Sequence, residues 1–220
     1  MFEKNNIKNK KVLINLGGTF EAIDPIRGIT NNSSGKMGLE LAKEAYILGA
    51  DLTVIAAHKD VKLPDLFKVI EVESSSEMQE ETLKHVAESD IFIGTAAISD
   101  FCPIEKQDFK ISSSLDLSLK FKPVSKIIRK IKVANPNIFL VGFKAEYNLS
   151  EEAIVDCAKK QIDDAQCDIV VCNDLSHEGC GFGSDKNEII LVSDDILKVP
   201  LSSKEDLAKI IFKQINQKLE

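Results

Sequence analysis

The strongest constraint on the fold of this chain is a regular alternation of short apolar runs with segments of helical periodicity. The runs KVLINL at 11–16, DLTVIAA at 51–57 and IFIGTAA at 91–97 each carry at most one charged residue. Strands that are apolar on both faces are typical of a parallel sheet covered by helices on both sides. The pattern therefore predicts an α/β fold with a Rossmann-like, doubly wound, mostly parallel sheet.

The other elements follow from the same two patterns. Gly49 is expected to end the first helix, and Ser75 or Ser76 to cap the second. Further strands are expected at 67–72, 138–143, 168–172 and 188–192, and helices at 35–48, 76–87, 124–131, 150–166 and 204–219.

Residues 99–122 interrupt this rhythm. Apolar and polar residues alternate with a period of two over 115–121, which predicts a surface strand or hairpin arm as a small excursion from the sheet. No linker or repeat divides the chain, so residues 11–220 are expected to form one domain after a polar tether at 1–10.

Composition excludes several classes of protein. The chain is 44% hydrophobic, which argues against intrinsic disorder, and no run approaches the ~18 apolar residues of a membrane-spanning helix. A formal net charge of −7 disfavours binding to nucleic acid or to an anionic membrane. The net charge does not exclude binding of small anionic ligands, provided that a local cluster of hydrogen-bond donors holds them.

Cysteine use indicates a reducing compartment. The number of cysteines, five, is odd, no pair is spaced C-x-x-C, and the first ten residues do not resemble a secretory signal, so we expect a cytoplasmic protein. His177 and Cys180, with Cys172 nearby, lack the fourth ligand of a structural zinc site, so buried thiols are the favoured interpretation.

Three glycine-rich places lie where ligands would bind, beyond the carboxyl ends of strands or at a helix start. Gly17, Gly18 and Thr19 follow the first strand as a Rossmann phosphate loop would, but the G-x-G-x-x-G fingerprint is incomplete and the ribose-binding acid is missing. A tight turn is the favoured interpretation of this triplet. An NAD(P)-dependent oxidoreductase remains an alternative function.

The segment NNSSGKMG at 31–38 contains more polar groups than a helix cap needs. Free backbone N–H groups and the helix dipole favour an anion at such a helix start. The segment GCGFGSDKN at 179–187 is either a substrate flap or a long hairpin tip. A nucleotide-binding module without catalysis is a further alternative, because these motifs indicate binding more directly than turnover.

Taken together, the motifs resemble the phosphopantothenoylcysteine synthetase family, and most closely its archaeal branch. They follow in order over nearly the whole chain: VLINLGGTFEAIDPIRGITNNSSGKMG (12–38), GTAAISDF (94–101), FKISS (109–113), VGFKAEYN (141–148) and DIVVCNDLSHEGCGFGSDKNEI (168–189). In many organisms this synthetase is the C-terminal half of a bifunctional protein whose other half is a flavin-dependent decarboxylase. The resemblance thus leaves open a stand-alone enzyme or one half of a longer chain.

The resemblance implies a phosphopantothenate–cysteine ligase of coenzyme A biosynthesis. Its carboxylate substrate, 4′-phosphopantothenate, attacks the α-phosphate of a nucleoside triphosphate, and L-cysteine then displaces the nucleotide. CTP is the expected co-substrate and Mg2+ the expected cofactor, although ATP in place of CTP stays open. The family works as a homodimer, and the 99–122 excursion is a candidate dimer element. A phosphopantothenoylcysteine decarboxylase is a candidate partner.

The resemblance also implies roles for individual residues. Asn31 matches the family's catalytic asparagine, Arg27 an arginine of the same step, and Lys110 a lysine that meets phosphate and substrate. Phosphates are expected against Gly17, Gly18, Thr19, Ser33, Ser34 and Gly35; the base and ribose against Gly94, Thr95, Ala96, Asp100, Ser125, Lys126, Ile127, Ile128 and Phe143; the metal ligands are not assigned.

Two lysines found on a helix in bacterial members are absent. Their positions hold Gln161 and Ala165, with Lys159 and Lys160 beside them as candidate replacements. Lys144 and the serines at 112–113 also differ from common bacterial forms, and the branch of the family that shares such features favours ATP.

Overall fold

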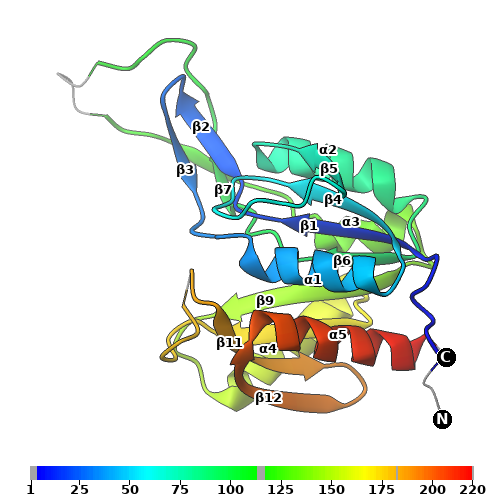
Figure 1. Cartoon of the computed structure of the whole chain (residues 1–220). Helices are drawn as coiled ribbons and strands as arrows, with labels where there is room; N and C mark the ends of the chain where they lie inside the picture. The colour runs from blue at the N-terminus through cyan, green and yellow to red at the C-terminus, as the bar shows by residue number, and fades with distance from the viewer. Residues whose placement is uncertain (1–3, 113–116, 182, 220) are drawn as a thin grey trace.

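The computed structural model of the chain describes residues 4–112, 117–181 and 183–219. Eight strands form one sheet in the order β12-β11-β10-β9-β6-β1-β4-β5 (Figure 1). The six strands from β10 to β5 run parallel, and β11 and β12 are antiparallel additions at one edge. The predicted Rossmann-like, mostly parallel sheet is therefore confirmed. The strands are β1 (Lys11–Leu16), β4 (Asp51–Ala56), β5 (Lys68–Glu71), β6 (Ile91–Gly94), β9 (Phe139–Glu146), β10 (Ile169–Asp174), β11 (Lys186–Val192) and β12 (Ile196–Ser203).

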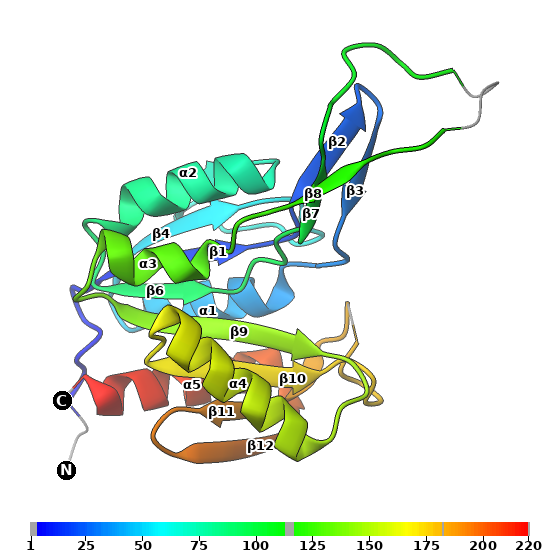
Figure 2. The same cartoon turned by 180° about the vertical axis from the view of Figure 1, so that it is seen from behind.

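Five helices cover the two faces of this sheet within the described part of the chain. α1 (Lys36–Ile47) and α5 (Lys204–Lys218) pack on one face, and α2 (Ser75–Val86), α3 (Ile128–Ala134) and α4 (Glu151–Ala165) on the other (Figures 1 and 2). Alternate residues of β1 enter the two apolar layers, Ile14 on the α1 side and Leu13 on the α2 side. Burial on both faces explains why the central strands read as continuous apolar runs.

A slender arm projects beyond the carboxyl end of the sheet (Figure 2). It consists of the hairpin β2 (Phe20–Asp24) and β3 (Arg27–Thr30), the pair β7 (Phe101–Pro103) and β8 (Phe121–Pro123), and residues 104–112 and 117–120. The predicted excursion thus lies outside the main sheet. Its period-two segment is no continuous strand, because residues 117–120 are irregular and β8 begins at Phe121; residues 113–116 lie outside the described residues.

The starts of α2 and α3 differ from the sequence prediction. α2 is capped by Ser74, one residue before the expected caps, because Ser74 Oγ accepts from Glu77 N at 3.2 Å and the Glu77 carboxylate accepts from Ser74 N at 3.1 Å. This is a capping box, which the spacing S-x-x-E specifies. The helix expected at 124–131 begins only at Ile128, since residues 124–127 form the turn that leads from the arm back to the sheet.

The segment before β1 packs against the end of the chain. Ile7 is fully buried, Asn6 N donates to Asn216 Oδ1 at 2.7 Å, and Asn5 Nδ2 donates to Leu48 O at 2.9 Å. Part of the expected tether therefore belongs to the folded body. Among the described helices, none combines the length and the apolar content needed to cross a membrane.

Candidate functional site

A cavity of about 960 Å³ opens at the carboxyl edge of the central strands. Each of four neighbouring parallel strands contributes a residue from its carboxyl half: Asn15 from β1, Gly94 from β6, Phe143 from β9 and Asn173 from β10. The chain order of the strands reverses between β1 and β6, so this is the switch point at which doubly wound sheets bind ligands.

The N-terminus of α1 forms one wall of the cavity. Asn31, Ser33, Ser34 and Gly35 line it directly before the helix. Gly35 occupies the N-cap position with φ 75° and has no side chain to cap the helix, and Ser34 Oγ accepts from Lys36 N only at 3.5 Å. Because this one contact is long, backbone N–H groups at the start of α1 remain available beside the cavity. This arrangement suits an anion, which the dipole of α1 also favours.

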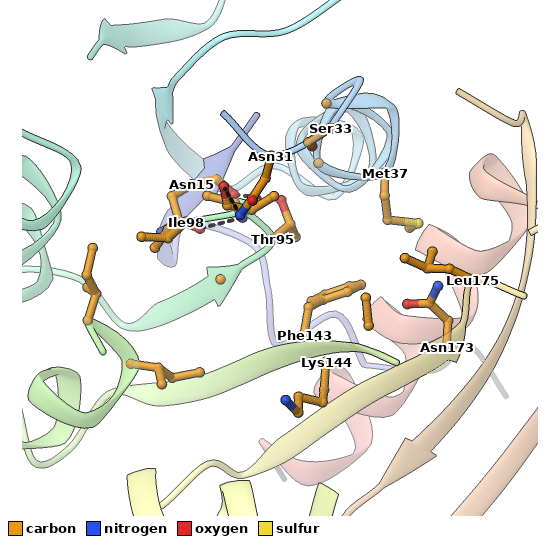
Figure 3. Close-up of a pocket in the computed structure, with 18 of the residues that line it drawn as sticks. Asn15, Asn31, Ser33, Met37, Thr95, Ile98, Phe143, Lys144, Asn173 and Leu175 are labelled. Carbon is orange, nitrogen blue, oxygen red and sulfur yellow. Dashed lines mark hydrogen bonds between the residues drawn. The ribbon is translucent and has the colours of Figure 1, made fainter. Parts of the chain in front are cut away.

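The end of β6 is fastened to β1 by the Asn15 residue. Thr95 Oγ1 donates to Asn15 O at 2.6 Å, and Ala96 N donates to Asn15 Oδ1 at 3.1 Å. Asn31 Nδ2 reaches Ala97 O at only 3.4 Å, so its exposed amide is weakly held and can turn to a ligand (Figure 3). These contacts fix the backbone of residues 94–97 at the cavity wall.

The opposite wall comes from β9, α3 and α4. Phe143 and Lys144 extend from β9 (Figure 3), and Ser125, Lys126, Ile127 and Ile128 precede or begin α3. Gln161 and Ala165 line the cavity at the two positions where the family lysines are absent. Lys160 also lines the cavity and Lys159 does not, so only Lys160 is placed to replace a missing charge.

The cavity is strongly basic although the chain is acidic. Its lining contains the cations of Lys36, Lys126, Arg129, Lys144, Lys160 and Lys204, and Asp164 is its one carboxylate among the described residues. Asp164 is itself paired with Arg129 at 2.5 Å. A concave surface with this balance attracts anions against the sign of the whole molecule.

Six of the residues expected in the site do not line the cavity: Gly17, Gly18, Thr19, Arg27, Asp100 and Lys110. The glycines instead allow a close backbone approach. A Cβ on Gly17 would lie 2.5 Å from His58 O, and a Cβ on Gly18 would lie 2.5 Å from Asn31 O. Thr19 is buried, and its hydroxyl bonds Ser99. These three residues therefore support the loop at 31–34 and do not line the cavity themselves.

Arg27 and Lys110 both belong to the arm. The Arg27 guanidinium donates to the buried Asp24 carboxylate and, at 2.7 Å, to Ile111 O. The Arg27 contact, with backbone N–H groups at 26, 27 and 111, holds the pKa of Asp24 well below its usual range. Lys110 is exposed beside this junction, and Asp100 forms an ion pair with Lys126 at the base of the arm.

The described residues contain no group of three or more His, Cys, Asp or Glu side chains that could cage a metal ion. Mg2+ often takes only one or two carboxylates and is otherwise carried by substrate phosphates. A magnesium ion that is carried by substrate phosphates would need no such cage. Burial raises the pKa of the Cys167 and Cys172 thiols to about 12, so these two thiols stay protonated at neutral pH.

The cavity residues that sequence reasoning did not assign include Asn15, Arg129, Asn173 and Lys204. Asn173 had a visible signal, since it directly follows the apolar run at 169–172 where parallel strands present ligand-binding groups. Lys204 had none, because its position depends on β12, which the sequence did not predict.

Comparison with known proteins places the chain in a defined group. The family model described as the DNA/pantothenate metabolism flavoprotein C-terminal domain matches residues 7–219. The coenzyme A biosynthesis bifunctional protein CoaBC of Thermococcus kodakarensis is 43% identical over 218 residues, which are 97% of this chain and 53% of that protein. The chain thus spans about half the length of the curated relatives it matches.

Solved structures agree with this result. The crystal structure of the C-terminal domain of a CoaBC protein is 27% identical, with a TM-score of 0.82 and 98% coverage of both chains. A Cab2 variant solved in complex with phosphopantothenate-cysteine is 18% identical, with a TM-score of 0.74 over 96% of this chain and 88% of that one. The second likeness concerns the fold alone.

Proposed function

The chain belongs to the DNA/pantothenate metabolism flavoprotein C-terminal domain family, and from this premise we propose that it is a phosphopantothenate–cysteine ligase of coenzyme A biosynthesis. The observation that carries the proposal is the basic cavity at the switch point of the sheet. Its lining contains six cationic side chains and one carboxylate, and the N-terminus of α1, whose N-cap residue has no capping side chain, forms one of its walls. The names of the CoaBC relatives and the ligand in the Cab2 complex support the choice of pathway and substrates.

The reaction needs no protein nucleophile. The carboxylate of 4′-phosphopantothenate attacks the α-phosphorus of CTP, which releases pyrophosphate and leaves an acyl-cytidylate. The amine of L-cysteine then attacks the acyl carbon, the C–O bond to the nucleotide breaks, and CMP leaves. Both steps bring anionic groups together, so the protein's work is to position reactants and to stabilise charge. Magnesium carried by the nucleotide phosphates would supply further charge neutralisation.

The cavity residues take the following roles in this proposal. Ser33, Ser34 and the N–H groups at the start of α1 hold phosphates, and Asn31 turns its amide to the reacting acyl group. The base and ribose lie against Gly94, Thr95, Ala96, Phe143 and residues 125–128. The preference for CTP or ATP depends on which base, cytosine or adenine, this pocket binds more tightly. Competition between the two nucleotides measures that preference.

The arm supplies the second half of the proposed site. Arg27 and Lys110 lie outside the cavity of one copy of the chain. The arm also exposes large apolar side chains, among them Phe101 at 60% and Phe109 at 65% exposure. Such a surface suits burial against a second copy, so we expect a homodimer in which the arms meet. Light scattering of the purified protein measures the mass, and a monomer at all concentrations would contradict this arrangement.

A two-stage assay tests the proposed function. The protein is mixed with 4′-phosphopantothenate, MgCl2 and either CTP or ATP, and pyrophosphate is measured before and after cysteine is added. We expect pyrophosphate in the first stage and nucleoside monophosphate with phosphopantothenoylcysteine only in the second. Nucleotide binding without pyrophosphate from either nucleotide would overturn the ligase and leave a binding module. We expect the reaction in the cytoplasm, with a decarboxylase on the same or a separate chain as the partner that consumes the product.

A further inference from the structure

One buried polar atom at the wall of the cavity has no hydrogen-bond partner. Gln161 lies on α4 and lines the cavity, and its side-chain nitrogen Nε2 is buried without a partner among the residues that the structure describes. The residue as a whole is part-buried, so its amide has an inner end, Nε2, and an outer end, Oε1. Leaving a buried donor unpaired is costly, so this orientation of the amide is unfavourable for the protein.

The unpaired nitrogen occupies a gap over Gly142 of β9. A Cβ on this glycine would lie 2.3 Å from Gln161 Nε2, 2.8 Å from Ile128 Cδ1 and 3.3 Å from Cys167 Sγ. The amide therefore fits there because residue 142 has no side chain, and its inner end shares the gap with one methyl group and one thiol. Ile128 begins α3, which packs with α4 beside β9 (Figure 2). Gln161 thus lies at the wall against which the base and ribose are proposed to bind.

The two neighbours of Nε2 suit an acceptor better than a donor. A methyl group accepts no hydrogen bond, and burial raises the pKa of the Cys167 thiol to about 12, so the thiol keeps its proton and can donate it. The two ends of an amide have nearly the same shape, and the terminal torsion of glutamine is broad. A half-turn of the amide therefore pairs Oε1 with the thiol and moves Nε2 to the outer end, on the side of the cavity.

We propose that Gln161 is a specificity-determining residue for the nucleoside: in the turned orientation its Oε1 accepts from the Cys167 thiol, and its Nε2 donates to an acceptor atom of the bound nucleoside. The carbonyl oxygens and ring nitrogens of a base and the hydroxyl oxygens of ribose are acceptors of this kind. Cys167 is then a positioning residue, because it holds the amide and does not touch the ligand. The inference rests on the proposed function and deepens it, since it concerns the nucleoside half of the co-substrate and not its phosphates.

Calorimetric titration with CTP or ATP and MgCl2 tests the inference, and inorganic tripolyphosphate is the probe that lacks a nucleoside. Gln161→Met keeps the length of the side chain and removes the amide. Gln217→Met, at an exposed position of α5, is the matched control. We expect Gln161→Met to weaken binding of at least one of the two nucleotides by about 10-fold, the loss of one hydrogen bond, with no change in the affinity for tripolyphosphate. The control should match the wild type with every probe.

Two variants of Cys167 test its positioning role. Cys167→Ala removes the donor that holds Oε1, so it should weaken nucleotide binding by about 3-fold. Cys167→Ser keeps a donor in the same place and should retain the affinity of the wild type. A role in packing alone would lower the melting temperature of both variants and leave their nucleotide affinity equal. Circular dichroism confirms the folding of each variant.

A further probe separates the base from the ribose. If Gln161→Met weakens 2′,3′-dideoxy-CTP as much as CTP, the acceptor lies on the base, and if it weakens CTP alone, the acceptor is a ribose hydroxyl. Unchanged affinity for CTP and ATP in folded Gln161→Met, or an equal loss with tripolyphosphate, would overturn the inference even if the ligase reaction proceeds. Nucleotide binding that depends on Gln161 in a protein without ligase activity would retain the inference and reject the proposed function.

Discussion

The cavity and the arm are built in opposite ways. The cavity residues sit on strands and helices whose apolar side chains form two continuous layers on the faces of the sheet. The arm has only short two-stranded pairs and exposes Phe101, Ile104 and Phe109. The Asp24–Arg27 ion pair and its hydrogen bonds to Ile111 hold the two branches of the arm together.

This difference separates two kinds of functional residue. Residues of the cavity are preorganised by the core, which is how a site keeps reacting groups in place. Residues of the arm are positioned by a few polar contacts, and such segments open at lower free energy than the core. Substitutions of exposed polar side chains in the cavity should therefore alter chemistry without lowering the stability of the protein, whereas substitutions in the arm should reveal whether the arm contributes to catalysis at all.

The largest effect is expected for Asn31→Ala. The Asn31 side chain is exposed and makes one long hydrogen bond, so its loss should change the free energy of unfolding by less than about 0.5 kcal/mol. Loss of a donor to a developing charge should lower kcat by about 100-fold or more. Steady-state kinetics and urea unfolding on the same preparation measure both. Full activity would remove Asn31 from the reaction.

Gly38→Ala tests the packing of the cavity wall. A Cβ at this position would lie 2.5 Å from Leu16 Cβ and 2.7 Å from Thr95 Oγ1, so α1 has to move away from the sheet. Such overpacking should lower the free energy of unfolding by about 1–3 kcal/mol. Gly181→Ala is the matched control, because a Cβ there meets nothing within 4 Å. Equal stability of the two variants would contradict the close packing of α1.

Lys110→Gln tests whether the arm contributes to catalysis. If Lys110 meets substrate, as we propose, kcat/KM should fall by roughly 10-fold, the loss of one charged hydrogen bond, with the melting temperature unchanged. Lys106→Gln, an exposed lysine on the same branch of the arm, is the control. Unaltered kinetics would reduce Lys110 to a surface residue and limit the site to the cavity.

Asp24→Asn tests the junction that holds the arm. The carboxylate contacts keep the folded-state pKa of Asp24 low, so they stabilise the protein above the unfolded pKa of about 3.9 and lose that effect as the pH falls toward the folded pKa. The variant should therefore melt at a lower temperature than the wild type at pH 7, and the difference should shrink below about pH 4. Asp108→Asn, an exposed carboxylate of the arm, should match the wild type at both pH values. A constant difference would show that ionisation of Asp24 does not stabilise the junction.

The same contrast between the core and the arm explains which elements could be predicted from the sequence. The central strands were predictable because burial on both faces leaves continuous apolar runs, as in 11–16 and 169–172. The hairpin at 20–30 was not, because its two strands have only five and four residues and its turn is fixed by Arg27 and Asp24, which pair only in the folded arm. β12 was not predicted for a related reason, since Pro200 and five exposed residues of eight hide the signal of an edge strand.

The residues of the candidate site likewise divide into those that the sequence predicts and those that it does not. Motifs that border one strand end, such as 31–35 and 94–96, converge because parallel strands present their carboxyl ends at one edge. The position of Lys204 at the cavity depends on how α5 follows the antiparallel edge, which no local pattern encodes. Lys110 lies outside the cavity because of the direction in which the arm projects. The local sequence of the arm does not encode this direction.

The most direct test of the account follows one oxygen atom. 4′-Phosphopantothenate labelled with ¹⁸O in its carboxylate is converted with CTP and cysteine, and the products are weighed by mass spectrometry. Attack of the carboxylate on the α-phosphorus predicts one ¹⁸O in the phosphate of CMP and none in pyrophosphate. CMP without label, or label in inorganic phosphate, would contradict the proposal that this cavity activates a carboxylate as an acyl-nucleotide.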